Sequence, residues 1–115
     1  DRKQPYCIRA VEGSDHEGLF ALAGLWESWR GGDQPLETFT ILTTTPNNIV
    51  APIHDRMPVI IQPKDYNLWL DPFNEDVQSL ASVLGPAPDA LLRAYPVSRH
   101  VNRPANDDAS CIDPV

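Results

Sequence analysis

Apolar and β-branched residues gather in short stretches along the chain, and polar turns separate these stretches. Their length and composition predict strands at residues 5–10, 20–26, 37–43, 59–61 and 91–97, with Val101 as a further extended position. The stretch at 20–26 is apolar almost without interruption, which is typical of a strand buried on both faces. Trp26 closes this stretch, so we expect its ring in the core.

Two later segments have the spacing of short amphipathic helices. Residues 64–70 place apolar side chains on one face directly after Pro63, a residue suited to a first helical turn. Residues 75–84 form a second such segment before the stop signal Gly85, with an apolar face of Val77, Leu80, Ala81 and Leu84. Residues 46–51 predict a short helical turn. The sequence therefore predicts an α+β fold of mixed, mainly antiparallel strands with short peripheral helices.

The composition is that of one small folded domain. The chain has 115 residues, and its 12 prolines favour strands and turns over a helical bundle. No apolar run approaches the ~20 residues that cross a bilayer, and the first residues lack the apolar core of a signal peptide. We therefore expect a soluble, cytoplasmic protein without a membrane partner, ending in a polar tail at residues 104–115.

The charges are unevenly distributed. Nine basic and 16 acidic residues give a formal net charge of −7, which argues against broad electrostatic binding to nucleic acid. However, no acid occurs between Asp89 and Asp107, where the basic side chains are Arg93, Arg99, His100 and Arg103. This stretch is either one basic groove or a basic strand beside an acidic tail.

The cysteines and histidines do not form a recognisable metal motif. Cys7 and Cys111 lie near opposite ends of the chain, and no C-x-x-C pair occurs. We expect two reduced thiols, and a disulfide that closes the long loop between them is the alternative. His16, His54 and His100 are too scattered for a typical zinc site. The sequence thus predicts no metal and no cofactor.

Candidate chemistry is concentrated at residues 53–58, where an imidazole, a carboxylate and a guanidinium lie together between apolar strands. An imidazole in a cleft can act as general acid or base, and the adjacent arginine can hold a phosphate through two hydrogen bonds. The alternative is a surface loop whose polar groups cap neighbouring backbone. The tryptophans offer a similar choice between core packing, which we favour, and a stacking platform for bases formed by Trp26, Trp29 and Trp69.

Several segments resemble one protein family, in order along the chain. They are Lys-Gln-Pro-Tyr at 3–6, Gly-Leu-Trp-Glu at 24–27, Thr-Ile-Leu-Thr-Thr at 40–44, Ala-Pro-Ile-His-Asp-Arg-Met-Pro-Val at 51–59, Trp-Leu-Asp-Pro at 69–72 and Pro-Val-Ser at 96–98. Together they resemble the SOS-response-associated peptidase (SRAP) family over roughly residues 3–103. The segment around His54 is highly specific to that family.

The resemblance implies covalent capture of abasic sites in single-stranded DNA. In the family, an N-terminal cysteine attacks the open-chain sugar aldehyde and closes a thiazolidine ring, and an autoproteolytic or peptidase activity is attributed to the same nucleophile. His54 matches the histidine that shuttles protons at the deoxyribose, a role suited to an imidazole near neutral pH. Arg56 matches an arginine on the DNA phosphate beside the lesion, Thr43 matches a hydroxyl near the lesion, and Asp55 looks structural.

The family's nucleophilic cysteine, active-site asparagine and catalytic glutamate have no match in this sequence. The chain opens Asp-Arg-Lys, Cys7 has no free α-amino group, and Glu27 falls in a different element from the family's glutamate. The resemblance therefore implies the C-terminal half of a single SRAP-like domain at residues 1–103, whose other half covers its open strand edges. The alternative is a non-catalytic fragment that binds protein, or that binds DNA through Arg56, Arg99 and Arg103.

Overall fold

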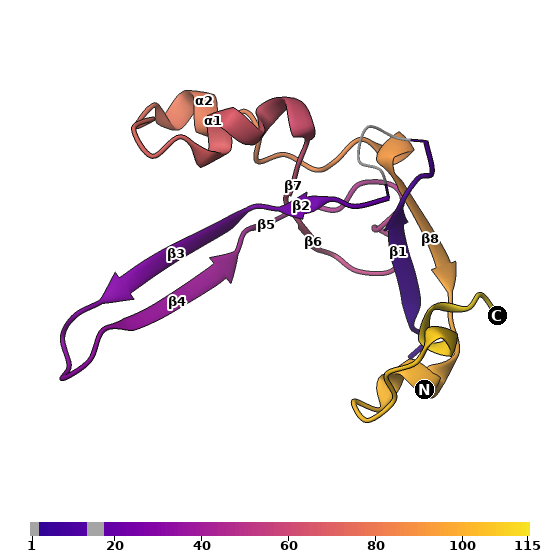
Figure 1. Cartoon of the computed structure of the whole chain (residues 1–115). Coiled ribbons are helices and arrows are strands. Elements are labelled where there is room, and N and C mark those ends of the chain that lie inside the picture. The colour runs from indigo at the N-terminus through magenta and orange to yellow at the C-terminus, as the bar shows by residue number, and fades with distance from the viewer. Residues whose placement is uncertain (1–2, 14–17) are drawn as a thin grey trace.

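A computed structural model describes residues 3–13 and 18–115 of the chain. Within these residues the strands pair into four antiparallel sheets of two strands each, joined to short helices (Figure 1). The α+β prediction with mainly antiparallel strands is therefore confirmed. No helix in this part of the chain is long and apolar enough to cross a membrane.

The first and last strands form one ladder. β1 (Tyr6–Ala10) pairs with β8 (Leu92–Pro96), with Tyr6 opposite Pro96 and Ala10 opposite Leu92. Backbone bonds from Val11 N–H to the Leu91 carbonyl (2.9 Å) and from Val97 N–H to the Pro5 carbonyl (3.1 Å) extend the ladder at both ends. The predicted strands at 5–10 and 91–97 are confirmed.

A long hairpin of β3 (Gly24–Trp29) and β4 (Leu36–Ile41) extends away from the rest of the molecule (Figure 1). The prediction of one strand at 20–26, buried on both faces, is wrong. The stretch divides into β2 (Ala21–Leu22) and β3, and Trp26 is 72% exposed. Its cross-strand neighbour Phe39 is 79% exposed, so the described part of the chain leaves both rings largely uncovered.

Three backbone segments meet where the strands change partners. Ala23 N–H donates to the Val59 carbonyl, Val59 N–H to the Leu42 carbonyl, and Leu42 N–H to the Ala23 carbonyl, each at 2.9 Å. Beyond this ring β2 pairs with β7 (Ile60–Ile61), and β5 (Thr43–Thr44) pairs with β6 (Met57–Pro58). The ring explains why the strands predicted at 37–43 and 59–61 are each interrupted.

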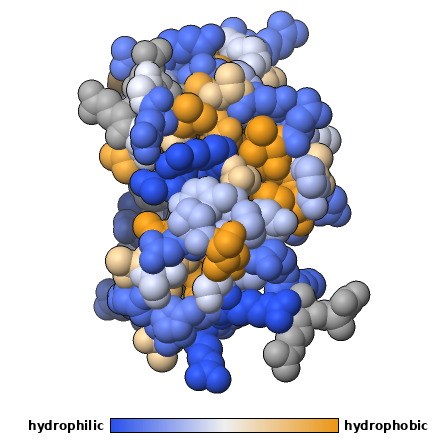
Figure 2. Space-filling model, turned by 90° about the vertical axis from the view of Figure 1, so that its right-hand side faces the viewer, coloured by the Kyte–Doolittle hydropathy of each residue, from blue (hydrophilic) through white to orange (hydrophobic). Residues whose placement is uncertain are grey.

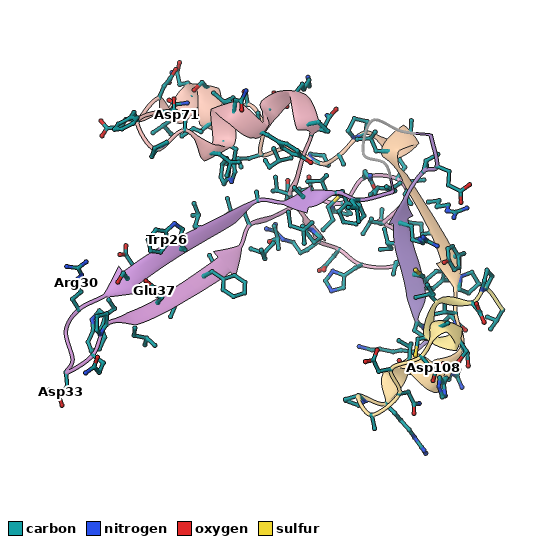
Figure 3. All side chains as sticks on the ribbon, viewed as in Figure 1. Trp26, Arg30, Asp33, Glu37, Asp71 and Asp108 are labelled. Atoms are coloured by element: carbon teal, nitrogen blue, oxygen red, sulfur yellow. The ribbon has the colours of Figure 1, made fainter. Side chains whose placement is uncertain are left out.

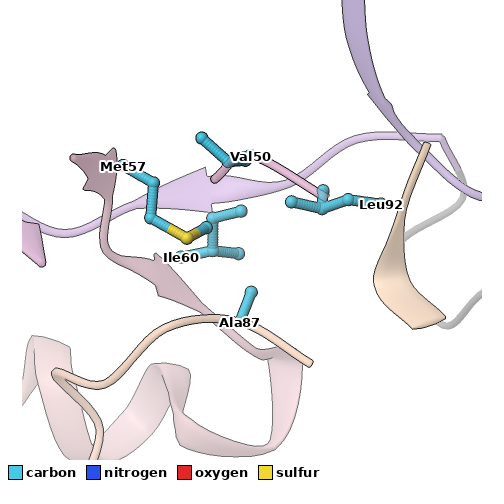
Figure 4. Close-up of a cluster of buried hydrophobic side chains, with 5 residues drawn as sticks. All are labelled: Val50, Met57, Ile60, Ala87 and Leu92. Carbon is cyan, nitrogen blue, oxygen red and sulfur yellow. The ribbon is translucent and has the colours of Figure 1, made fainter. Parts of the chain in front are cut away.

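The core lies around this junction in two small clusters. One contains the buried side chains of Val50, Met57, Ile60, Ala87 and Leu92 (Figure 4). The other is built on Ala23, Val59 and Ile61, with Trp69 among the side chains packed against it. The clusters bring the middle of the chain against both β8 and the helices, so they fix the loop between β5 and β6.

The helices lie to one side of the strands (Figure 1). Pro63 opens η1 (Pro63–Asp65), which continues into α1 (Tyr66–Leu70), so the predicted helix at 64–70 is confirmed. The helix predicted at 75–84 is shorter, because α2 spans only Val77–Ala81. The Asp76 carboxylate caps its start by accepting the N–H groups of Gln78 and Ser79, and Val77 is 75% exposed rather than packed.

The chain after β8 forms two short 3₁₀ segments, η3 (Arg99–Asn102) and η4 (Ala109–Ile112), so Val101 is helical rather than extended. An earlier 3₁₀ segment, η2 (Asp89–Leu91), precedes β8. The segment 104–115 folds back on the β1–β8 ladder through bonds from the Tyr95 hydroxyl to the Ile112 carbonyl and from Val115 N–H to the Pro96 carbonyl. Hydrogen bonds from Ser110 and then His100 lower the pKa of the Asp108 carboxyl to about 2.

The chain buries less of its surface than a compact protein of its mass. Its accessible area is 8748 Å², whereas about 6,300 Å² is expected at this size. The radius of gyration is 17.1 Å, against about 13 Å for a compact chain of this length. Apolar side chains reach the surface among polar ones on the face shown in Figure 2, and the hairpin adds more.

Candidate functional site

The loop that carries the predicted chemistry is held by a buried asparagine. Asn47 is only 8% exposed; its Nδ2 donates to the Ala87 carbonyl at 3.0 Å and its Oδ1 accepts the Val50 N–H at 3.0 Å. These bonds shape the predicted turn at 46–51, and His54 N–H closes it on the Val50 carbonyl at 2.9 Å. A buried amide with both ends satisfied fixes the loop more firmly than an exposed turn would.

His54 follows this turn with its side chain 66% exposed. Its Nδ1 lies 3.0 Å from the Arg56 backbone N–H and 3.1 Å from the Asp55 carboxylate. The N–H group suits a neutral ring that accepts at Nδ1, whereas the carboxylate suits a protonated ring that donates from Nδ1. The imidazole therefore has a local partner in either protonation state, as proton transfer requires.

Arg56 and Thr43 are in direct contact. The guanidinium Nη2 donates to Thr43 Oγ1 at 2.7 Å and to the Thr43 carbonyl at 3.0 Å. Thr43 belongs to β5 and Arg56 directly precedes β6, so the pairing of these two strands brings the side chains together. The structure thus places the three residues singled out from the sequence, His54, Arg56 and Thr43, within one loop and strand pair.

An apolar pocket of about 190 Å³ opens beside this loop. His54 and Arg56 contribute to its lining, together with core side chains from β1, β7 and β8 such as Ile8, Ile60 and Leu92. Neither cysteine lines it. The pocket thus places an apolar wall beside the exposed imidazole and guanidinium.

The positive stretch after Asp89 is partly neutralised by neighbouring acids. Arg93 forms an ion pair with Glu12 at 3.2 Å and lies over the Tyr95 ring at 5.9 Å. His100 faces Asp108 at 2.8 Å. These pairs favour a basic strand beside acidic side chains over one continuous basic groove.

Cys7 and Cys111 are free, half-buried thiols, and His16 lies outside the described residues.

The tryptophans do not form one platform. Trp69 packs on the core cluster as expected, but Trp26 is exposed and lines an open groove of about 360 Å³ between β3 and α1 that also contacts Trp69 (Figure 3). Trp29 instead folds over Gly31, where an added Cβ would clash with the indole ring. The core interpretation is correct for Trp69 and wrong for Trp26.

Sequence reasoning missed Asn47, the residue that positions the loop. Its signal was the Pro-Asn-Asn triplet at 46–48, which indicates a turn but not which amide is buried. Asn48 is also structural, because its backbone N–H and Nδ2 bind the two carboxylate oxygens of Asp89 at 3.0 and 2.7 Å. Both asparagines tie the loop to the segment before β8.

The family model described as SOS response associated peptidase (SRAP) matches residues 1–104. The chain therefore belongs to the SRAP family. Among relatives, the abasic site processing protein YoqW of Bacillus subtilis (strain 168) is 45% identical over 96 residues, covering 83% of this chain and 43% of that protein. The abasic site processing protein HMCES of Gallus gallus is 32% identical over 130 residues, covering 98% of this chain and 38% of that protein.

The structural comparison agrees with the sequence match. A crystal structure of a protein from Bacteroides thetaiotaomicron aligns with a TM-score of 0.81 and 27% identity. The alignment covers 99% of this chain and 49% of that chain. The abasic site processing protein YedK of Escherichia coli (strain K12) is 29% identical over 116 residues, covering 100% of this chain and 50% of that protein. The chain thus spans between 38% and 50% of the length of these four proteins.

Proposed function

We propose that this chain is the C-terminal half of an SRAP domain that captures abasic sites in single-stranded DNA by a covalent crosslink. The observation that carries the proposal is the contact between Arg56 and Thr43, which places His54 and the guanidinium together at one apolar pocket. Relatives that bear the name abasic site processing protein support the substrate class.

His54 is the proton carrier in this proposal. Opening the deoxyribose ring exposes the aldehyde and requires one proton to leave a hydroxyl and another to reach the ring oxygen. The contacts of His54 with Asp55 and the Arg56 backbone all involve Nδ1. We therefore assign Nε2 to the sugar: in the neutral ring Nδ1–H donates to the Asp55 carboxylate or the Arg56 carbonyl, which leaves the Nε2 lone pair free to take up the proton and return it. The same transfers run in reverse when the crosslink is released.

Arg56 is the phosphate anchor. A guanidinium carries five N–H groups, and its two bonds to Thr43 use both hydrogens of Nη2. The N–H groups of Nη1 and Nε remain, and each can donate a single charge-assisted hydrogen bond to a phosphate oxygen. Thr43 accordingly acts by orienting Arg56.

The nucleophile comes from the other half of the domain. Cys7 lies in the β1 ladder and Cys111 in η4, and neither lines the pocket beside His54.

In this proposal, the hairpin of β3 and β4 provides the interface for the other half of the domain. Trp26 and Phe39 point to one face of the hairpin and Leu25 and Trp29 to the other, and all four are more than half exposed. Apolar side chains on both faces favour burial between other strands.

The peptidase activity named in the family description rests on the same nucleophile, so in this proposal it requires both halves. We place the protein in the cytoplasm, where it would bind abasic sites in nucleoid DNA.

The second candidate function is a binding module without chemistry. It is favoured by the positions of Cys7 and Cys111, because a chain that lacks a cysteine at the pocket can bind DNA through Arg56 but cannot crosslink it.

The test is a crosslinking assay on a labelled single-stranded oligonucleotide with one abasic site. Two proteins are compared on a denaturing gel: this chain alone, and a fusion in which it replaces the matching half of the B. subtilis YoqW protein. We expect a covalent adduct from the fusion only. An adduct from the chain alone would overturn the half-domain proposal, and a folded fusion without adduct would favour the binding module.

A further inference from the structure

A second cluster of reactive side chains lies in the C-terminal segment, away from the His54 loop. His100 belongs to η3, Asp108 caps η4, and Cys111 lies within η4. Their ligand atoms all lie within 4.8 Å of one another. Figure 3 shows Asp108 in this segment, next to the β1–β8 ladder. Sequence spacing gave no indication of it, because seven residues separate His100 from Asp108.

The side chains of this cluster are held in place by their neighbours. Asn106 Nδ2 donates to the His100 carbonyl at 2.6 Å and lies 3.1 Å from His100 Nδ1. The Ser110 N–H and hydroxyl both donate to Asp108 Oδ1, which leaves Oδ2 facing His100 Nε2 at 2.8 Å. Cys111 Sγ lies 3.6 Å from the Asn106 carbonyl. Each of the three side chains therefore has a second partner that limits its orientation.

We propose that His100, Asp108 and Cys111 bind one zinc ion. An imidazole nitrogen, a carboxylate oxygen and a thiolate are the three ligand types that zinc takes in proteins. At ordinary Zn–ligand distances these atoms stand roughly 3.3–3.6 Å apart around the metal. His100 Nε2 and Asp108 Oδ2, now 2.8 Å apart, would separate by about 0.5 Å, and atoms near the 4.8 Å limit would approach by about 1 Å. His100 and Asp108 keep 39% and 53% of their side-chain surface exposed, which gives them room to move and water room to supply the fourth ligand.

Charge and proton balance are consistent with this assignment. The carboxylate and thiolate together neutralise the two charges of Zn²⁺. The Cys111 thiol releases its proton to solvent. The ring proton of His100 moves from Nε2 to Nδ1 as the metal takes Nε2, and the Asn106 Nδ2 group, a donor 3.1 Å from Nδ1, must turn away to admit it. The bound metal replaces the hydrogen bond between His100 and Asp108 and joins η3 to η4. It thereby fastens residues 99–112 beside β8, independently of any DNA chemistry at His54.

The test uses the 115-residue chain stripped of metal and titrated with Zn²⁺ by calorimetry and with Co²⁺ by absorption. We expect one metal per chain and a near-ultraviolet thiolate-to-cobalt charge-transfer band. Cys111→Ser, which is nearly isosteric, should abolish the band, and His100→Gln should weaken zinc binding by roughly tenfold or more, since outer partners alone change affinity by about 10–100-fold. Cys7→Ser is the matched control and should leave both signals unchanged.

Three results would overturn the proposal: no stoichiometric zinc binding, zinc affinity unchanged in both Cys111→Ser and His100→Gln, or a band that depends on Cys7 instead. Circular dichroism of each variant verifies that it retains the fold of the parent. Protection of residues 104–115 from proteolysis on adding zinc provides an independent readout of the fastened segment.

Discussion

Arg56 and Thr43 lie 13 positions apart in the sequence, yet one guanidinium nitrogen donates to both the hydroxyl and the carbonyl of the threonine, at 2.7 and 3.0 Å. The contact follows from the pairing of β5 with β6, which places Thr43 opposite Pro58. It fixes the guanidinium through Nη2 and leaves the N–H groups of Nη1 and Nε for a ligand. If Arg56 is the proposed phosphate anchor, it is oriented before DNA binds, which lowers the entropic cost of binding.

Replacing Arg56 with alanine should weaken binding to single-stranded DNA and reduce its salt dependence. Loss of one phosphate contact lowers the slope of log affinity against log salt by about 0.7 for single strands. Fluorescence anisotropy at several salt concentrations measures both quantities. Arg30→Ala is the charge-matched control, because Arg30 lies at the end of the hairpin (Figure 3). Equal losses from the two variants would contradict a specific anchor at Arg56.

Thr43→Val should have a smaller effect than Arg56→Ala. The variant removes the hydroxyl acceptor but retains the backbone carbonyl that also accepts from Nη2. A hydrogen bond to a charged group contributes about 1.5–3 kcal/mol at most, and this one is exposed, so we expect affinity to fall by roughly tenfold or less. A loss as large as that of Arg56→Ala would show that Thr43 itself contacts the DNA.

Asn47→Ala should destabilise the chain by about 1–3 kcal/mol, because it leaves the buried Ala87 carbonyl and Val50 N–H without their partners. Urea unfolding followed by circular dichroism measures the change. Asn48→Ala is the neighbouring control; its side-chain bond to Asp89 is exposed, so its cost should stay under about 1 kcal/mol. If the two variants unfold at the same urea concentration, Asn47 does not hold the loop as argued.

Trp26→Ser combined with Phe39→Ser should weaken association of the chain with its other half by at least about tenfold. The two rings lie directly opposite each other on one face of the hairpin and are largely exposed. Sedimentation velocity on mixtures of this chain with the first half of the YoqW protein measures association. Phe73→Ser, a 90% exposed apolar residue outside the hairpin, is the control and should leave association unchanged. If the double variant and the parent bind the other half with equal affinity, the hairpin is not part of the interface.

The sequence predicts an element well where the local residue pattern alone determines its structure. Strands β1 and β8, the helix after Pro63 and the turn at 46–51 follow from local pattern, and the structure contains each of them. The His54 loop is a candidate from its residues alone, because His54, Asp55 and Arg56 are consecutive, and its role stays a prediction. The contact between Arg56 and Thr43 was not, because it depends on how two distant strands pair.

The errors come from positions whose environment lies elsewhere in the chain or outside it. An apolar run such as 20–26 predicts burial, and only a second layer over Trp26 would bury it. The partner changes at Ala23, Leu42 and Val59 depend on a three-way backbone junction that no local pattern encodes. The cluster of His100, Asp108 and Cys111 likewise forms only when the C-terminal segment folds back.

The most direct test of the central claim is the rate of covalent adduct formation by the fusion protein with and without His54. Under single-turnover conditions on the abasic oligonucleotide, His54→Ala should slow adduct formation or its reversal by about 100-fold, because the variant lacks the general acid and base. Its affinity for the DNA and its urea midpoint should stay near those of the parent. Unchanged rates of both formation and reversal in a folded His54→Ala fusion would contradict the account.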